Sequence, residues 1–441
     1  MKFTKVRLGE IAQFINGRAY KNTEFKESGT PIIRIQNLTG GGNTVYSDLE
    51  LPENKYIDNG DLIYAWSATF GPYIWRGKKS IYHYHIWKVI PFESTDKFYL
   101  YYLLKHISDR ISSQGTGSIF SHVTKGLMES FEVDVLPFDE QVKVGKVLQN
   151  LDNQIHINYQ IIQTLESMAQ AIFKSWFIDF DPVHAKIAAK QEGKDSELAA
   201  MCAISGKSEA ELQQMAEDDL AELHATAALF PDELVESELG EVPKGWEYKK
   251  LKNLCRVING RAYKNTEFKD EGIPIVRIQN LTGGGKTVFS DLDLPQDKLI
   301  EKEDFIYAWS ATFGPYIWRG PKSIYHYHIW KMDVNETIIS RYFLYLTMFR
   351  KTESMKSAGT GSIFTHLTKA IMESQDVLIA DNAINMLFKD RIDKIFKLIS
   401  LKSDEINNLE NIRDTLLPKL LSGEIDASDL GSETEYEYST K

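Results

Sequence analysis

The sequence repeats itself over a very long period. The segment NGRAYKNTEFK at 16–26 returns unchanged at 259–269, and IYAWSATFGPYIWRG at 63–77 returns unchanged at 306–320. Both pairs are separated by 243 residues, which is far beyond the 20–50 residues of solenoid repeats. The chain is therefore a tandem duplication of one domain, with about 135 residues in each copy.

Each copy carries the pattern of a mixed α/β domain. Short runs rich in Ile, Val, Tyr and Trp are separated by turn residues such as Asp58-Asn59-Gly60 and Gly71-Pro72, which predicts short strands. Apolar residues at helical spacing over 96–112 predict one helix after these strands. We therefore expect an α+β protein in which two such domains alternate with other segments. The expected boundaries are 1–136 and 241–380 for the two domains, 137–180 and 381–423 for two long helices, 181–240 for an acidic linker and 424–441 for an acidic tail.

A heptad pattern of apolar residues predicts the two long helices. The first apolar seam consists of Leu148, Leu151, Ile155, Ile162, Leu165, Ala169, Ile172 and Trp176. The second consists of Ile392, Ile395, Ile399, Ile406, Leu409, Leu416 and Leu420. A helix of about 37 residues is roughly 55 Å long and cannot bury such a stripe alone. We expect the helices to pair as an antiparallel coiled coil with a pseudo-two-fold axis, the alternative being that each folds back on its own domain.

The remaining segments and the composition restrict the class of protein. Residues 181–240 show short helical signals around 196–228, and the Ser/Thr-rich tail at 424–441 is expected to fray. Only two cysteines occur, Cys202 and Cys255, which favours a reducing, cytoplasmic setting without a disulfide framework. No run of 18 apolar residues exists, and the start, MKFTKVRLGE, lacks a signal-peptide stretch, so we expect no membrane segment.

Charge is distributed unevenly along the chain. The net charge is −11, yet residues 1–136 carry +2 and residues 241–380 carry +4. Residues 137–240 carry −12 and residues 381–441 carry −5. The duplicated domains are thus mildly basic and the helical parts acidic. This distribution of charge favours binding of a polyanion by the duplicated domains. Net charges as small as +2 and +4 would not by themselves bind DNA strongly.

The sequence shows no motif of a catalytic or metal site. GGGKT at 283–287 lacks the first glycine of a phosphate-binding loop, which should stand five residues before Gly285, where Asn280 stands, and a strand is expected to follow it. His83 and His85 lie two apart on a predicted strand, without nearby Cys, His or Asp to complete a metal site. We expect no catalytic residue, no metal and no cofactor on this chain.

Hydrogen-bonding side chains between glycines and aromatic residues are the features that repeat. Arg, Gln and Asn make bidentate contacts to guanine and adenine, while Ser, Thr and Lys bind phosphates. The alternative is that they are ordinary surface and strand residues. The candidate DNA contacts are Arg34, Gln36, Asn37, Thr39, Ser67, Thr69, Thr116, Ser118, His122 and Lys125, with Arg277, Gln279, Asn280, Thr282, Ser310, Thr312, Thr360, Ser362, His366 and Lys369 in the second copy.

Four further motifs resemble those of a known family. They are LPFDEQ at 136–141, AIFKSWFIDFDPVHAK at 171–186, LFPDELVESELGEVPKGWE at 229–247 and LENIRDTLLPKLLSGEI at 409–425. With them the chain resembles, over nearly its whole length, the specificity (S) subunits of type I restriction-modification systems (the HsdS family). One departure is IADNAIN at 379–385, where the second helix lacks the opening of the first.

The resemblance implies a DNA-reading subunit within a larger complex. Its partners would be double-stranded DNA, two modification subunits that carry S-adenosylmethionine and methylate adenines, and two restriction subunits that use ATP and Mg²⁺. The aromatic helix end at Trp176, Phe177 and Phe180 is expected to help bind the modification subunits, unless these rings only pack the seam. The near-identity of the two copies predicts a palindromic bipartite site. The alternatives are a standalone duplicated DNA-binding regulator and an anti-restriction interaction protein.

Overall fold

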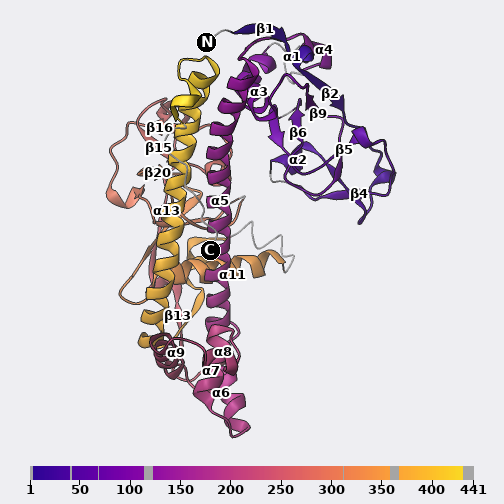
Figure 1. Cartoon of the computed structure of the whole chain (residues 1–441). Helices are drawn as coiled ribbons and strands as arrows, with labels where there is room; N and C mark the ends of the chain where they lie inside the picture. Colours follow the sequence, from indigo (N-terminus) through magenta and orange to yellow (C-terminus); the bar gives the residue numbers. More distant parts are fainter. Residues whose placement is uncertain are drawn as a thin grey trace. The chain divides into compact units, whose positions relative to one another are not determined.

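The computed structural model describes residues 3–39, 42–67, 69–113, 123–310, 312–357 and 367–430 (Figure 1). The chain divides into two compact units. Unit 1 is formed by residues 1–157 with 405–441, and unit 2 by residues 158–404. Each unit thus combines one of the two repeated domains with a part of each long helix.

Unit 1 contains two four-stranded sheets and one two-stranded sheet. The first sheet is antiparallel throughout, in the order β2 (Ala12–Asn16), β9 (Ile86–Pro91), β6 (Leu62–Ala65), β7 (Gly71–Ile74). The second has the order β4 (Val45–Ser47), β3 (Thr30–Ile33), β8 (Ser80–Tyr82), β5 (Tyr56–Ile57), with β3 parallel to β8. β1 (Thr4–Arg7) pairs with β10 (Glu132–Val135). The helices of this domain are α1 (Leu8–Ile11), α2 (Ile35–Leu38), α3 (Lys97–Ser113) and α4 (Lys125–Ser130), with the short 3-10 helices η1 (Asn22–Glu24) and η2 (Glu53–Lys55).

Unit 2 repeats this topology strand for strand. Its sheets have the orders β14 (Cys255–Asn259), β21 (Ile329–Val334), β18 (Phe305–Ala308), β19 (Gly314–Ile317) and β16 (Val288–Ser290), β15 (Ile273–Val276), β20 (Ser323–Tyr325), β17 (Leu299–Ile300). β13 (Glu247–Lys250) pairs with β22 (Asp376–Ile379). The helices are η3 (Leu251–Asn253), η4 (Asn265–Glu267), α10 (Ile278–Leu281), η5 (Gln296–Lys298), α11 (Arg341–Ser357) and α12 (Lys369–Glu373). The predicted duplication and mixed α/β character are confirmed, as is the predicted helix at 96–112.

Two sequence expectations about local structure are corrected. Gly71-Pro72 does not form a turn but begins β7, where proline is tolerated because β7 is an edge strand. His83 and His85 do not lie on a strand but in the turn between β8 and β9. The strand β16 does follow GGGKT, as expected.

The two long helices pack against each other in opposite directions within each unit. α5 (Phe138–Phe177) and α13 (Asn382–Leu421) each span 40 residues. In unit 1 the beginning of α5 and the end of α13 share one core, which includes Val144, Leu148, Leu417, Leu420 and Leu421. In unit 2 the end of α5 and the beginning of α13 share another, which includes Ala169, Phe173, Trp176, Phe177, Ile384, Phe388, Ile392 and Phe396. The antiparallel pairing is confirmed, and the same cores also contain strand residues, so each domain packs on the helices too.

A polar seam position explains how the pair is aligned in unit 1. Arg413 Nη1 donates to Asp152 Oδ1 at 2.7 Å, and the Tyr102 hydroxyl donates to Asp152 Oδ2 at 2.7 Å. Both side chains of the ion pair are largely buried, with 13% of Arg413 and 19% of Asp152 exposed. A buried pair of this kind favours one register over others, because a shifted register would separate Arg413 from Asp152 and leave Arg413 with only the exposed Asp414 as an ion-pair partner.

Residues 181–240, expected as an acidic linker, are a folded part of unit 2. The segment forms α6 (Asp181–Gln191), α7 (Ser196–Ser205), α8 (Glu209–Leu212), α9 (Glu217–Leu229) and a hairpin of β11 (Leu234–Ser237) and β12 (Gly240–Pro243). The buried Lys186 donates to Glu197 Oε1 at 2.9 Å and to the Phe230 carbonyl at 2.8 Å, which joins α6 to α7 and to the end of α9.

The described part of the chain ends shortly after α13. A short 3-10 helix, η6 (Ala427–Leu430), follows α13, and most of the predicted tail, at 431–441, lies outside the described residues. Within the described ranges, no helix combines the length and the apolar character that a membrane span requires.

Candidate nucleic-acid interface

An aromatic and histidine cluster lies where β6, β8 and β9 of unit 1 meet their loops. The Trp66 ring centroid is 5.2 Å from that of His85 and 6.1 Å from that of Tyr84. Trp66 Nε1 also donates to the Tyr84 carbonyl at 2.8 Å. The His83 and His85 rings are 4.9 Å apart. Tyr84 is 40% exposed, so the cluster presents an aromatic ring to solvent.

The repeated segment 16–26 crosses this turn at very close range. A Cβ on Gly17 would lie only 2.4 Å from the Tyr82 carbonyl oxygen, so glycine is required there. The Arg18 amide donates to the same carbonyl at 3.1 Å, and its guanidinium donates to Glu24 at 2.7 Å and lies over the Tyr20 ring. This segment therefore adds a basic and an aromatic side chain beside the cluster. We call the cluster and this segment, together with α2 and the loop after it, the loop face.

Two predicted DNA contacts, Arg34 and Asn37, build the loop after α2. The Arg34 amide donates to Asn37 Oδ1 at 3.0 Å, which caps the helix, and Arg34 Nη2 donates to the Asn43 carbonyl at 2.7 Å. Gln36 and Thr39 are exposed on the same helix and its end. The structure thus gives Arg34 and Asn37 a positioning role, and leaves Gln36 and Thr39 facing solvent. In the second copy Arg277 and Asn280 are held in the same way and Thr282 is exposed, while the exposed Gln279 also accepts from Arg277 Nη2 at 2.7 Å through its side-chain oxygen.

The other predicted contacts fall into three groups. Ser67 and Thr69 are half-buried in the loop between β6 and β7, next to Trp66 of the loop face, as Ser310 and Thr312 are in unit 2. Lys125 begins α4, which packs against α1 at the start of β2, whereas the loop face follows the end of β2 (Figure 1). Lys125 pairs with Glu129 at 3.4 Å, and Lys369 begins α12 in the same way. The structure therefore does not bring these lysines to the loop face. The third group, Thr116, Ser118, His122, Thr360, Ser362 and His366, lies outside the described residues.

Electrostatics in the loop face keep His83 neutral at pH 7. Burial of the ring lowers the pKa of His83 to about 4, with further lowering by His85 and by Arg34. The pKa of His326 is lowered by the same causes, burial followed by His328 and Arg277. A neutral imidazole offers one donor and one acceptor, so this ring can hydrogen-bond a base without adding charge. Among the described residues, no group of three or more His, Cys, Asp and Glu is placed to hold a metal ion.

Sequence reasoning did not include Arg18, Tyr20, Trp66 and Tyr84 among the candidates. The signal was present, since all four belong to segments that recur unchanged after 243 residues. The recurrence does not show that the four side chains form one cluster, because they come close only after the chain has folded, when segment 16–26 crosses the turn at 83–85.

The predicted partner-binding aromatics at the end of α5 contribute to the core of unit 2. Trp176 and Phe177 are only 2% and 4% exposed, and the Phe177 ring lies 4.9 Å from both Phe343 and Phe388. Phe180 is half-buried against Trp246. Seam packing, the alternative given above, thus describes Trp176 and Phe177, and partner binding at this helix end stays a prediction. Phe177 and Phe180 also line a surface cavity of about 310 Å³ with Ile178 and Tyr248.

Comparison with known proteins identifies the family. A family model described as the type I restriction modification DNA specificity domain matches residues 1–167 and 243–411. The HindI specificity subunit of Haemophilus influenzae is 30% identical, across 95% of this chain and 98% of that protein. The MjaVIII specificity subunit of Methanocaldococcus jannaschii is 23% identical, across 96% of this chain and 93% of that protein.

A solved structure agrees with these sequence matches at the level of the fold. The S subunit of a type I restriction-modification system from M. genitalium aligns over 96% of both chains with a TM-score of 0.51, at 14% identity. The two family matches fall on the two repeated domains, and each continues into the long helix that follows. This chain belongs to the family of type I restriction-modification specificity subunits, and its role is DNA sequence specificity.

Proposed function

We propose that this chain is the non-catalytic subunit that reads a bipartite, palindromic site on double-stranded DNA, each unit reading one half. The observation that carries the proposal is the equivalence of the two loop faces. Tyr84 and Tyr327 are each 40% exposed, and each accepts, through its carbonyl, a 2.8 Å hydrogen bond from the preceding repeated tryptophan. Surfaces with equal side chains in equal positions recognise equal bases.

Within each loop face, we assign base reading to the exposed side chains. A glutamine amide can bond to both N6 and N7 of adenine, which suits Gln36 and Gln279. Hydroxyl side chains near the aromatic cluster, such as Ser67 and Thr69, suit phosphate contacts that position the domain. The positive net charge of residues 1–136 and 241–380 supports this orientation toward DNA.

The chemistry belongs to partner subunits in this proposal. Two modification subunits would supply S-adenosylmethionine and methylate adenines, and two restriction subunits would supply ATP- and Mg²⁺-dependent activity. The absence of catalytic motifs from the sequence supports this division, and the two cysteines support a cytoplasmic setting.

Base reading is tested by removing the glutamines. We expect Gln36→Ala to weaken binding of the cognate duplex by about 1–3 kcal/mol, which is roughly 5- to 150-fold, and to relax specificity in one half-site. Gln279→Ala should do the same in the other half-site. Fluorescence anisotropy with the complex of this chain and its modification subunits measures both effects. Lys125→Ala and Lys369→Ala are the controls, because these lysines lie away from the loop face; the assignment is wrong if they relax specificity and the glutamine variants do not.

We place the modification subunits at two equivalent cavities near the ends of the long helices. In unit 2 the cavity holds Ile178, which is 44% exposed just after α5. In unit 1 a cavity of about 540 Å³ is lined by Leu421 and Ser422, which follow Phe177 and Ile178 by 244 residues in the repeat. Two equivalent cavities on one chain, each lined by both apolar and charged side chains, suit two copies of one partner.

We expect Ile178→Asp to weaken binding of a modification subunit at least tenfold, because a carboxylate at the mouth of the cavity opposes apolar packing. Surface plasmon resonance with the immobilised chain measures this affinity. Met168→Asp is the matched control, since Met168 is 48% exposed on α5, ten residues before Ile178, and does not line the cavity. Equal losses in the two variants, with equal melting temperatures, would place the partner elsewhere.

A further inference from the structure

One turn has the same backbone in both units but a different side chain. The Gly60 amide donates to the Trp75 carbonyl at 2.7 Å, and the Glu303 amide donates to the Trp318 carbonyl at 2.8 Å. The carbonyl of each residue then accepts a hydrogen bond from the first residue of the following helix. Positions 60 and 303 are therefore equivalent in structure as well as in sequence. Comparing unit 1, which has Gly60, with unit 2, which has Glu303, shows what changes when a carboxylate is present at this position.

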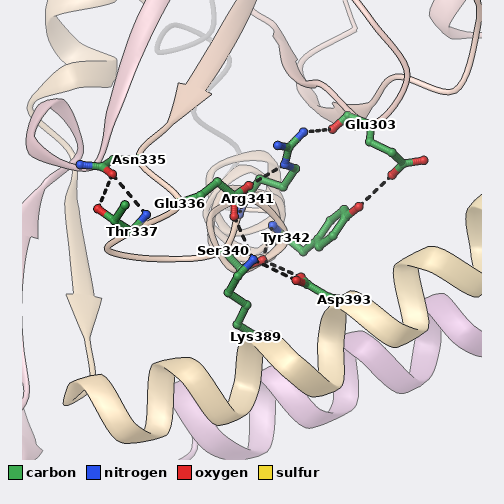
Figure 2. A network of polar contacts seen from close by, with 9 residues as sticks. All are labelled: Glu303, Asn335, Glu336, Thr337, Ser340, Arg341, Tyr342, Lys389 and Asp393. Carbon is green, nitrogen blue, oxygen red and sulfur yellow. Dashed lines mark hydrogen bonds and ion pairs between the residues drawn. The ribbon is translucent and has the colours of Figure 1, made fainter.

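In unit 2 the Glu303 carboxylate lies between the second repeated domain and α13. It accepts from Arg319 Nη1 at 2.7 Å and from the Tyr342 hydroxyl at 2.9 Å, and Figure 2 shows its carboxylate directed at that hydroxyl. The Phe396 ring stacks on Tyr342 with centroids 4.1 Å apart, on the side of α13. Glu303 has a φ of 72°, a conformation that costs energy for a non-glycine residue. These contacts offset that cost.

Unit 1 lacks the groups that fill this space in unit 2. Gly60 replaces Glu303, Phe98 replaces Tyr342, and the shorter Asp152 replaces Phe396. A Cβ on Gly60 would come no nearer than 3.9 Å to any neighbouring heavy atom, so the space beside it is open. The result is a cavity of about 370 Å³ in unit 1, a size that suits a small organic ligand.

The arginine that pairs with Glu303 in unit 2 has an unpaired counterpart in unit 1. Arg76, the equivalent of Arg319, lines the cavity, and no residue in the described part of the chain forms a hydrogen bond or ion pair with its guanidinium. The one carboxylate in the cavity wall, Asp152, is already bound by Arg413 and by the Tyr102 hydroxyl. The cavity therefore carries an uncompensated positive charge.

We propose that this cavity binds a carboxylate from outside the chain, in the place that the Glu303 carboxylate takes in unit 2. Arg76 is its ion-pair partner, Tyr73 and Tyr101 provide aromatic walls, and the amides of Gln149 and Asn153 are available to the rest of the ligand. The carboxylate can belong to a free organic acid or to an acidic side chain of a modification subunit. The second source rests on the proposed function, whereas the first does not.

Binding is tested with 4-fluorobenzoate, observed by ¹⁹F NMR as it is added to the full chain. Saturable binding is expected for the natural chain. Arg76→Ala should weaken it at least tenfold by removing a charge-assisted hydrogen bond. Gly60→Glu should abolish it, because the new carboxylate would occupy the site as Glu303 does. Lys78→Ala, which removes an exposed cation two residues from Arg76 that does not line the cavity, should leave it unchanged.

The source of the carboxylate is decided by measuring the affinity of a modification subunit for the same variants. If an acidic side chain of the partner is the ligand, Arg76→Ala and Gly60→Glu each weaken assembly at least tenfold, and 4-fluorobenzoate competes. If a free acid is the ligand, assembly is unchanged while 4-fluorobenzoate still binds. The proposal is overturned if 4-fluorobenzoate does not bind and neither variant alters assembly. In that case the complex can still form and read DNA normally, so the proposed function would stand. Failure of the complex to read DNA would instead contradict the proposed function.

Discussion

Methylated sites mapped in cells that contain this chain and its modification subunits will form one bipartite palindrome, with half-sites of about three or four base pairs that are reverse complements. The physical reason is that the two units present equal loop faces. Unit 1 packs on the beginning of α5 and the end of α13, and unit 2 on the beginning of α13 and the end of α5. We propose that this exchange of helix ends between the two repeated domains makes the two half-sites inverted repeats of each other.

Single-molecule sequencing of modified DNA measures the site directly. Two unrelated half-sites would refute the inference that the two repeated domains recognise the same bases. A matched pair of variants separates base reading from phosphate contact. Lys286→Asn makes the second loop equal to the first at Asn43, and Lys286 is 82% exposed with only a weak pairing to Asp270 at 3.4 Å. The recognised sequence should therefore not change in this variant, whereas Gln279→Ala should relax one half-site only.

Asp152→Leu is expected to lower the free energy of unfolding of unit 1 by about 3–5 kcal/mol, because it leaves the largely buried Arg413 with only the exposed carboxylate of Asp414 as a partner. The loss also affects Tyr102, whose hydroxyl donates to the same carboxylate. Unfolding in urea, followed by circular dichroism, measures the change. Since an ordinary domain is stable by only about 5–15 kcal/mol, the effect should be large in the midpoint as well.

The double variant Asp152→Leu with Arg413→Met is the control for this interpretation. Replacing both charges by apolar side chains of similar size should restore most of the lost stability. Lys394→Ala provides a second control, since its ion pair with Asp390 is exposed and should contribute under about 0.5 kcal/mol. If the double variant were no more stable than Asp152→Leu alone, a lost packing contact rather than an unpaired charge would explain the result.

The sequence alone determined the architecture, because architecture depends on patterns that are local or periodic. The exact recurrence of 16–26 after 243 residues required two copies of one domain, and the strands and the helix of each copy followed from their composition. The heptad seam required two long helices, and Leu148, Ile155, Ala169 and Trp176 are buried as the seam predicts. Periodicity records which face of an element is apolar, so it also predicted that the helices would pair.

Tertiary structure decided what individual side chains do, because that depends on neighbours distant in sequence. Arg34 has the chemistry of a base-reading residue, yet its guanidinium holds the Asn43 carbonyl. Arg413 interrupts the seam, and only its contact with Asp152, 261 residues away, explains why.

The same dependence on distant neighbours separates two side chains of equal local sequence. Arg76 and Arg319 lie in the identical segment IYAWSATFGPYIWRG, and the first local difference comes only after it, at Lys78 and Pro321. Arg319 is paired, whereas Arg76 has no ion-pair partner among the described residues, because the opposing turn carries Glu303 in one unit and Gly60 in the other. A side chain's charge follows from its residue type, whereas the partner that neutralises it depends on which residues the tertiary structure brings close.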